Sequence, residues 1–375
     1  MKKKILFITG TRADFGKLKP LMQEISKLEE YEYAIFATGM HQLSKYGKTL
    51  NEIEKAGLTN VFPYINQVDS DDMEMILANT IKGLSRYLHE TKVDLIVVHG
   101  DRVEALAGAI TGSLRNILVA HVEGGEISGT IDELIRHSIS KLSHIHFVAT
   151  DTAKKRLLQL GEKENTIYQI GSPDVDVMLS DNLPSLKDAM LRYQIDYENY
   201  AIAILHPVTT DSLEIQRSNA EIFVDSLMDS QMNYIVIYPN NDSGSNEILS
   251  SYEKFIDCPR TTVFPSLRFE YFLTFLRNSE YIIGNSSAGI HEAPIYAVPT
   301  INIGTRQENR FSHETIFDTP FHKHKILETI SVLKQKPKFE PARAYGNGKS
   351  AESFRDALPK IWSLSNQKQF KDLNF

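Results

Sequence analysis

Short apolar runs alternate with polar, helix-forming stretches along most of this chain, and this rhythm constrains the fold more than any other feature. In the first half, strands are expected at residues 4–9, 33–38, 94–99, 117–122, 144–148 and 166–170. A polar segment interrupts the rhythm, which then restarts with strands expected at 200–205, 234–238, 281–284 and 299–304. Repeated βα units with short apolar strands predict an α/β fold with doubly wound parallel sheets.

The length of the chain and this interruption predict two Rossmann-like domains. At 375 residues the chain exceeds what one hydrophobic core usually accommodates. The expected domains span residues 1–178 and 186–354, and the polar segment with Pro184 is the expected linker.

Charge and cysteine content limit the partners and the location. A net charge of −7 and a pI near 6.0 argue against nucleic acid or an anionic membrane as a partner, because such proteins carry a basic surplus. The single Cys258 excludes an intrachain disulfide and suits a reducing compartment. The apolar run at 5–8 is too short for a signal peptide, and no stretch approaches the ~20 apolar residues of a membrane span. We therefore expect a cytoplasmic protein.

Candidate chemical groups are concentrated in residues 120–146. An apolar strand end is followed by Glu123, a pair of glycines and a helix expected to begin at about Ile131. Open α/β sheets present ligand-binding groups in this way, at the carboxyl ends of their strands. Asp132 and Arg136 are four residues apart and share one helix face. A plain crossover, in which Asp132 only caps and charges a helix start, fits the same pattern.

Other polar groups occupy equivalent positions in the first half. Gly10 ends the first strand and opens a loop in which Arg12 and main-chain amides suit a phosphate, although the loop lacks the full dinucleotide fingerprint. The alternative for Arg12 is a solvated surface charge. Because strand ends line one crevice in a doubly wound sheet, Arg12, Asp101 and Glu123 are expected to converge there. Asp132 lies just past the end of a strand.

The second half contains a similar loop, GNSSAG at residues 284–289. Small residues rich in amides at a helix start suit a diphosphate, and Arg306 can add a charge-assisted contact. Glu292, one turn into the expected helix, suits ribose hydroxyls. Plain N-capping is the alternative for Ser286 and Ser287, but it leaves the flanking glycines unexplained.

Two further patterns predict no ligand site. GNGKS at residues 346–350 is similar to the end of a P-loop, but Arg343 replaces the first glycine and no strand precedes it. We expect a loop that caps the last helix. The histidine pairs at 144/146 and 322/324 lack a metal-site pattern, so no metal is expected.

These motifs, in this order, give the chain a specific resemblance over almost its whole length. The motifs are TRADFG at 11–16, HGDR at 99–102, EGGEISGTID at 123–132, HPVTTD at 206–211, PNNDSG at 239–244, GNSSAG at 284–289 and GTRQ at 304–307. The chain resembles the hydrolysing UDP-N-acetylglucosamine 2-epimerases of bacterial sialic acid synthesis. Non-hydrolysing epimerases typically carry alanine in place of Gly124, followed by a different loop. One departure is His291, where relatives usually carry arginine.

The resemblance implies a GT-B fold, in which a nucleotide binds in the cleft between two Rossmann-like domains and a final helix, at about 355–375, packs back on the first domain. It implies catalytic carboxylates at Asp101, Glu123 and Asp132. It implies a homodimer or homotetramer without a cofactor. The implied UDP contacts are Arg12, Arg102, His206, Asn240, Ser286, Ser287, Glu292 and Arg306.

The expected reaction converts UDP-N-acetylglucosamine and water to N-acetylmannosamine and UDP, through elimination to 2-acetamidoglucal and hydration. Asp101 and Asp132 are expected to transfer protons and water, while Glu123 positions the sugar and the base. The nearest alternative is the same reaction on UDP-N,N'-diacetylbacillosamine in legionaminic acid synthesis. A GT-B glycosyltransferase and a non-enzymatic nucleotide-sugar sensor are further alternatives. The sensor is disfavoured because three clustered carboxylates would repel a diphosphate.

Overall fold

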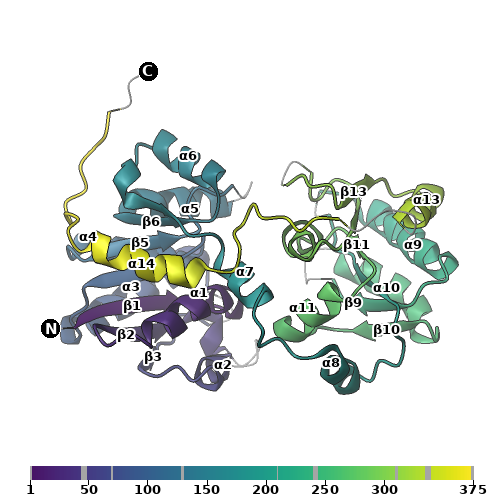
Figure 1. Cartoon of the computed structure of the whole chain (residues 1–375), viewed down its shortest axis with the longest axis horizontal. Coiled ribbons are helices and arrows are strands. Elements are labelled where there is room, and N and C mark those ends of the chain that lie inside the picture. The colour runs from purple at the N-terminus through teal and green to yellow at the C-terminus, as the bar shows by residue number, and fades with distance from the viewer. Residues whose placement is uncertain are drawn as a thin grey trace. The chain divides into compact units, whose positions relative to one another are not determined.

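The computed structural model describes residues 2–43, 49–68, 71–127, 131–208, 210–239, 244–308, 311–333 and 339–372. The chain divides into two compact units (Figure 1). The first unit comprises Met1–Leu179 and Ala344–Phe375, and the second comprises Ser180–Arg343. Each unit is built on one parallel sheet.

The first unit contains a seven-stranded sheet of order β3-β2-β1-β4-β5-β6-β7, and every neighbouring pair is parallel. The order reverses between β1 and β4, where an open α/β sheet places its ligand crevice. The strands are β1 (Lys3–Thr9), β2 (Tyr31–Ala37), β3 (Val61–Pro63), β4 (Leu95–His99), β5 (Leu118–Val122), β6 (Ile145–Val148) and β7 (Ile167–Gln169).

Both faces of this sheet are covered, which explains why its central strands are mostly apolar. Along β1, Phe7 packs with α1 and α14 on one face, while Leu6 and Ile8 pack with α3, α4 and α5 on the other. The helices of the unit are α1 (Arg12–Ile25), α2 (Leu50–Lys55), α3 (Met73–Glu90), α4 (Val103–Leu114), α5 (Ile131–Leu142), α6 (Asp151–Gln159), α7 (Pro173–Met178) and α14 (Ser350–Ile361). Single turns of 3-10 helix occur at η1 (Gly39–Gln42) and η3 (Glu164–Thr166).

The last helix, α14, packs beside α1 although the whole second unit separates them in sequence (Figure 1). Its Phe354 lies with ring centroids 6.4 Å from Phe7 and 4.7 Å from Phe147. The helix predicted at about 355–375 therefore starts and ends earlier, at Ser350 and Ile361. The chain already rejoins the first unit at Ala344, before the predicted domain end at 354.

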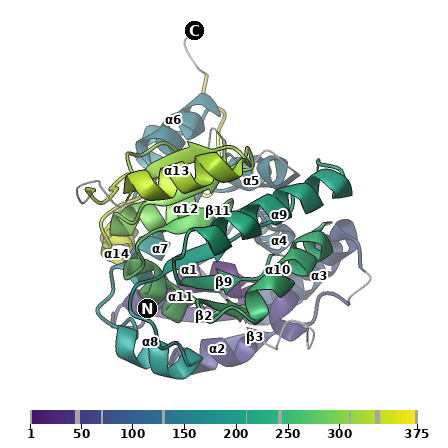
Figure 2. The same ribbon diagram turned by 90° about the vertical axis from the view of Figure 1, so that its right-hand side faces the viewer.

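The second unit contains a six-stranded sheet of order β10-β9-β8-β11-β12-β13, also parallel throughout. Helices α9, α10 and α13 pack together over one face, as Figure 2 shows. The strands are β8 (Ala201–Ile204), β9 (Tyr234–Ile237), β10 (Thr261–Phe264), β11 (Ile282–Gly284), β12 (Thr300–Ile303) and β13 (Ile316–Thr319). The helical segments are α8 (Leu186–Tyr193), α9 (Leu213–Asp229), α10 (Ser245–Ile256), α11 (Phe269–Arg277), α12 (Ala288–His291), η4 (Ala293–Tyr296) and α13 (Lys323–Leu333).

Three strands were not predicted from the sequence: β3, β10 and β13. Each lies at the edge of its sheet and has three or four residues that are mostly not fully buried. An edge strand needs no continuous apolar run, so the pattern used for the central strands can miss it, although it did predict the edge strand β7 at residues 166–170.

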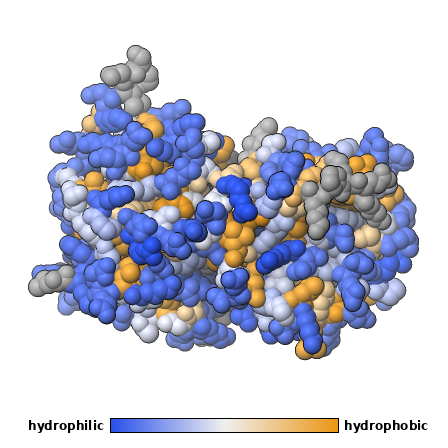
Figure 3. Space-filling view, in the orientation of Figure 1, coloured by the Kyte–Doolittle hydropathy of each residue, from blue (hydrophilic) through white to orange (hydrophobic). Residues whose placement is uncertain are grey.

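No helix in the described part of the chain is long and apolar enough to cross a membrane. Hydrophilic residues predominate on the face drawn in Figure 3, and hydrophobic ones reach the surface there in separate groups.

Candidate active site

In the first unit, the candidate groups follow the carboxyl ends of β1, β4 and β5, which are neighbours where the strand order reverses. Arg12 is the first residue of α1, Asp101 follows β4, and Glu123 follows β5. Glu123 adopts a left-handed backbone conformation with φ 68°. This conformation costs about 1–2 kcal/mol for a residue other than glycine, so the surrounding contacts must hold it.

The Glu123 carboxylate lies among basic groups. Its Oε2 is 2.6 Å from Nε2 of His99 and 3.0 Å from Nζ of Lys17, which also lies 3.3 Å from Oδ2 of Asp174. Burial alone would raise the pKa of Glu123, but Lys17, His99 and Arg136 hold it well below its usual range. Glu123 is therefore an ionised anchor at neutral pH rather than a proton donor.

Arg136 joins the two strand-end carboxylates. Its side chain is 7% exposed, and its Nη1 donates a hydrogen bond of 2.8 Å to the main-chain oxygen of Glu123. Its Nη2 pairs with the carboxylate of Asp101. Helix α5 thus fixes Asp101 and Glu123 through one planar guanidinium, which can serve two acceptors at once.

Asp132 lies in the first turn of α5 and is exposed. It precedes Arg136 by one helical turn, on the same helix. The residues at 128–130 that lead into this turn lie outside the described part of the chain. The structure therefore joins Asp101 with Glu123 and places Asp132 at the exposed start of the helix that joins them.

Glu126 lies in the loop after Glu123 but has the opposite electrostatics. Burial, reinforced by the charge of Glu123, raises its pKa. Its Oε1 accepts a hydrogen bond of 3.5 Å from Thr150, and its Oε2 lies 3.9 Å from Nη1 of Arg156. Two carboxyl groups with opposed pKa shifts in one turn can divide acid and base roles.

His121 of β5 is fully buried and contacts both the turn after β4 and helix α5. Its Nε2 lies 2.8 Å from the main-chain oxygen of Gly100, and its Nδ1 lies 3.0 Å from Oγ of Ser140 on α5. Because a carbonyl can only accept, Nε2 carries the proton in this arrangement. Burial lowers the pKa of His121 well below its ordinary value, so the ring is neutral.

The two predicted phosphate-binding arginines each pair with a glutamate. Arg12 Nε lies 3.0 Å from Oε2 of Glu52, and both side chains are partly exposed. Arg102 makes a forked pair with Glu104, with Nε–Oε2 and Nη2–Oε1 distances of 3.0 and 3.2 Å.

In the second unit, the buried residue Asn285 connects three loops through its side chain and its main-chain oxygen. Its Oδ1 accepts a hydrogen bond of 2.6 Å from the His206 amide, and its Nδ2 donates one of 2.8 Å to the His206 carbonyl. Its own carbonyl accepts hydrogen bonds from Arg306 at 3.1 Å and Gln307 at 2.9 Å. Asn285 therefore brings the loops of His206, Ser286 and Arg306 together.

The helix that follows the loop at Ser286 ends before Glu292, which corrects the prediction that Glu292 lies one turn inside it. Helix α12 has only four residues, and Glu292 caps its end rather than lying within it. Its contribution to anion binding through a helix dipole is accordingly small. Ser286 Oγ accepts from the Ala288 amide at 3.3 Å, whereas Ser287 makes no side-chain cap. Gly284 is required sterically, because an added Cβ would lie 1.9 Å from the Ile204 carbonyl oxygen of β8.

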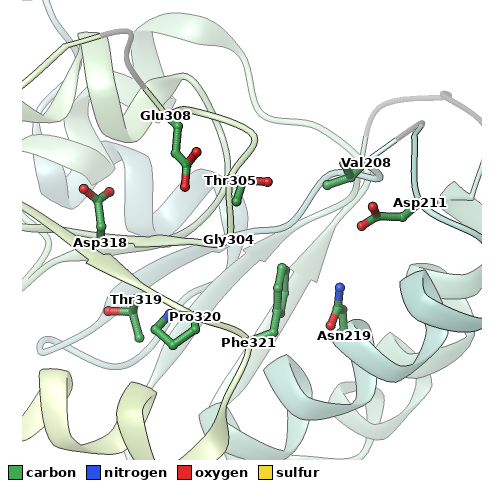
Figure 4. Close-up of a pocket in the computed structure, with 10 residues that line it drawn as sticks. All are labelled: Val208, Asp211, Asn219, Gly304, Thr305, Glu308, Asp318, Thr319, Pro320 and Phe321. Carbon is green, nitrogen blue, oxygen red and sulfur yellow. The ribbon is translucent and has the colours of Figure 1, made fainter.

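A cavity of about 450 Å³ adjoins these loops in the second unit (Figure 4). Asp211, Glu308 and Asp318 contribute carboxylates to its wall, together with Thr305 and Phe321. Such a lining repels a diphosphate, so the cavity does not fit the anion predicted for the neighbouring residues.

Asn240, another predicted UDP contact, lies outside the described residues. Within the described ranges, no group of three or more His, Cys, Asp or Glu side chains is arranged to hold a metal ion.

The model of one protein family, described as UDP-N-acetylglucosamine 2-epimerase, matches residues 23–359. The chain belongs to the UDP-N-acetylglucosamine 2-epimerase family.

Relatives within this family align over nearly the whole chain. A UDP-N-acetylglucosamine 2-epimerase of Neisseria meningitidis serogroup B is 46% identical over 99% of this chain and 100% of its own length. The UDP-N,N'-diacetylbacillosamine 2-epimerase (hydrolyzing) of Legionella pneumophila is 34% identical, covering 96% of this chain and 97% of its own.

Solved structures support the fold. The UDP-GlcNAc 2-epimerase of Methanocaldococcus jannaschii superimposes with a TM-score of 0.80 at 22% identity, over 95% of this chain and 99% of that one. The Neisseria meningitidis UDP-GlcNAc 2-epimerase superimposes with a TM-score of 0.81 at 18% identity, over 95% of this chain and 100% of that one. The predicted α/β fold of GT-B type with two Rossmann-like domains is confirmed.

The structure also adds residues that sequence reasoning did not assign to the site of this epimerase-family chain. Lys17 and Asp174 lie outside the motifs, and their proximity to Glu123 depends on tertiary packing. Glu126 lies within the EGGEISGTID motif, three residues after Glu123, but no role was assigned to it from the sequence. Arg136 was recognised only as a neighbour of Asp132 on the helix. The sequence signal for its role was an arginine placed one helical turn after a carboxylate.

Proposed function

We propose that this chain is a hydrolysing UDP-N-acetylglucosamine 2-epimerase, which converts UDP-N-acetylglucosamine and water to N-acetylmannosamine and UDP for sialic acid synthesis. The observation that carries the proposal is the cluster in which Arg136 joins Asp101 to Glu123 at the strand ends. Family membership supports it, as do relatives at 34% identity named as hydrolyzing and a 32% identical polysialic acid biosynthesis protein of Escherichia coli.

The first requirement is stabilisation of the departing UDP. Arginine side chains and main-chain amides can stabilise its charge without a metal. We assign its contacts to Arg12, Arg102, His206, Asn240, Ser286, Ser287, Glu292 and Arg306.

Elimination then breaks the C1–O and C2–H bonds of the sugar nucleotide and forms the C1–C2 π bond and a carboxyl O–H bond. The C1–O bond releases UDP with its electron pair, a carboxylate removes the C2 proton, and the C2–H electrons form the C1–C2 double bond of 2-acetamidoglucal. We assign the proton transfers to Asp101 and Asp132. The anchored, ionised Glu123 suits the positioning of the sugar and the base, because basic groups hold it in place.

Hydration reverses the bond changes on the opposite face at C2. Water gives hydroxide to C1 and loses a proton to a carboxylate, while an acid delivers a proton to C2. The product is N-acetylmannosamine. Glu126 is an additional candidate for the acid, because its raised pKa keeps it protonated at higher pH than Glu123.

The second candidate is the same reaction on UDP-N,N'-diacetylbacillosamine. Relatives from Legionella pneumophila and Campylobacter jejuni, each 34% identical to this chain, are named for that sugar. The higher identity to the Neisseria meningitidis relative favours UDP-N-acetylglucosamine.

The test is NMR of the purified chain with each sugar nucleotide in heavy water. We expect free N-acetylmannosamine with deuterium at C2, together with UDP. Formation of UDP-N-acetylmannosamine would instead indicate a non-hydrolysing epimerase, and turnover of only the diacetamido sugar would select the second candidate. A requirement for an acceptor would indicate a glycosyltransferase. In Asp132→Asn, accumulation of 2-acetamidoglucal would place Asp132 in hydration, whereas unchanged turnover would remove it from the mechanism.

A further inference from the structure

Glu104 is a buried carboxylate in the first turn of α4, with 1% of its side chain exposed. A buried ionised carboxylate is costly unless it is paired. Its hydrogen-bond donors among the described residues are Nε and Nη2 of Arg102, at 3.0 and 3.2 Å. This forked geometry fixes the plane of the guanidinium as well as its position.

The backbone around Glu104 leaves room for this pair and for little else. A Cβ added to Gly10 would lie 2.8 Å from Cδ of Glu104, and one added to Gly39 would lie 2.6 Å from its Oε1. Gly39 also has a positive φ of 61°, and its amide donates to Oδ1 of Asn66 at 2.8 Å. The two glycines thus enclose the carboxylate between the loops that follow β1 and β2.

The pair leaves Arg102 charged and partly available. Burial opposes its charge, but Glu104 raises the pKa of Arg102 above its usual value. Its side chain remains 34% exposed, and its Nη1 makes no hydrogen bond to any described residue. A guanidinium has five N–H donors, so donors remain for a ligand after two serve Glu104.

We infer that Glu104 is a positioning residue that holds Arg102 in the orientation in which its remaining donors bind the diphosphate of the nucleotide sugar. This inference rests on the proposed function, in which Arg102 contacts UDP. A free arginine loses rotamer freedom when it binds an anion, whereas a guanidinium already fixed in the folded protein does not lose it again.

Because Glu104 is negatively charged, the direction in which Glu104→Gln changes the affinity for UDP separates positioning from a simple charge effect. As a negative charge beside an anion-binding arginine, Glu104 would weaken UDP binding if it acted only through its field. In that case Glu104→Gln, which removes the charge and keeps the shape, would bind UDP more tightly. Positioning predicts the opposite, because glutamine cannot accept both N–H groups of the fork.

The experiment measures the affinity for UDP by calorimetry in Glu104→Gln, Arg102→Met and the double variant. We expect Glu104→Gln to weaken UDP binding about tenfold. Because Glu104 acts through Arg102, we expect the double variant to bind no more weakly than Arg102→Met, within about twofold. If Arg102→Met alone does not fold, the double variant, which removes both members of the pair, is compared with Glu104→Gln instead. We then expect the double variant to bind UDP no more tightly than Glu104→Gln does.

The matched control is Glu247→Gln, which breaks another pair between a first-turn glutamate and an arginine, Glu247 with Arg217 at 2.7 Å. It should leave UDP affinity unchanged. Tighter binding in Glu104→Gln, a lower melting temperature with unchanged UDP affinity, or independent losses in the double variant would overturn the inference.

The outcomes also separate this inference from the proposed function. Coupled losses of UDP affinity without release of free sugar would support the role of Glu104 and contradict the hydrolysing reaction. Release of N-acetylmannosamine by the wild-type chain without coupling between positions 102 and 104 would support the reaction and contradict the role of Glu104.

Discussion

Nη1 of Arg136 donates a hydrogen bond of 2.8 Å to the main-chain oxygen of Glu123, a residue in the left-handed conformation. The same guanidinium pairs with Asp101 through Nη2. The guanidinium of Arg136 on α5 therefore binds both the strained turn at Glu123, after β5, and the carboxylate of Asp101, after β4. A strained backbone conformation persists only where surrounding contacts hold it, and the hydrogen bond from Arg136 to Glu123 is one of these contacts.

Replacing Arg136 with lysine should separate charge from geometry. A lysine keeps the positive charge, but its single ammonium cannot span the Glu123 carbonyl and the Asp101 carboxylate as the planar fork does. We expect UDP release from UDP-N-acetylglucosamine to fall about 100-fold, because small displacements of catalytic groups cost rates of that size. Arg115→Lys, at an arginine that donates to the Leu88 carbonyl, is the control. Wild-type turnover in Arg136→Lys would show that the fork is dispensable.

Lys17→Met should change the pH profile. Lys17 lies 3.0 Å from Glu123 and favours its ionised form, so its removal raises the pKa of Glu123. A carboxylate that must be ionised for activity then becomes protonated at a higher pH. We expect the acid limb of kcat/KM to move to higher pH, measured by UDP release across the pH range.

The control for this profile is Lys82→Met at an exposed lysine of α3. It should leave the acid limb in place. An unmoved acid limb in Lys17→Met would mean that Glu123 does not set it.

The central strands could be predicted from the sequence because strands buried on both faces are mostly apolar, as residues 95–98 of β4 are. The sequence also placed Glu123 and Asp101 at strand ends, because the residues that follow a predicted strand can be read directly from the sequence. It could not give the basic surroundings of Glu123. Lys17 lies 106 residues away in sequence, and only the parallel arrangement of β1, β4 and β5 brings it to the carboxylate.

The predicted loop at Ser286 shows a different limit. Its composition predicted an amide-rich loop at the start of a helix, and in the structure Gly284 lies against β8. The length of the following helix, however, depends on Pro294 and the turn of η4, which end it after four residues. Asn285 had no assigned role, because its partner His206 is 79 residues away.

Glu162 should carry part of the acid stability of the first unit. Its side chain is 1% exposed, and although burial opposes ionisation, hydrogen bonds from His146, Lys141 and Lys368 lower its pKa from 4.5 to about 2. A lowered pKa stabilises the fold above pH 4.5 and loses that contribution as the pH falls toward 2. The shift corresponds to stability on the order of 3 kcal/mol at neutral pH.

Urea unfolding of Glu162→Gln at several pH values tests this contribution. We expect a large loss of unfolding free energy at pH 7 that shrinks below pH 4.5, where the wild type loses the same interactions. Glu328→Gln, at an exposed glutamate paired with Lys325, should show little loss at any pH. A loss in Glu162→Gln that did not change with pH would indicate a packing defect instead.

Asp176 of α7 caps the start of α14 across the chain. Its Oδ1 and Oδ2 accept hydrogen bonds of 2.8 Å from the amides of Ser350 and Ala351. Because helix-start amides have no partners within the helix, Asp176→Ala should cost about 2 kcal/mol of unfolding free energy, and Asp176→Asn should cost less. In Asp176→Ala, the amides of the first turn of α14 should also exchange hydrogen faster than in the wild type.

Asp356→Ala, on the exposed face of the same helix, separates capping from a general effect on α14. It should leave both the unfolding free energy and the exchange at Ser350 nearly unchanged. If the unfolding free energy of Asp176→Ala is also nearly unchanged, α14 is held by the packing of Phe354 on Phe7 and Phe147 and not by the cap. A loss confined to Asp176→Ala would show that a side chain from before the second unit fixes where the helix after it begins.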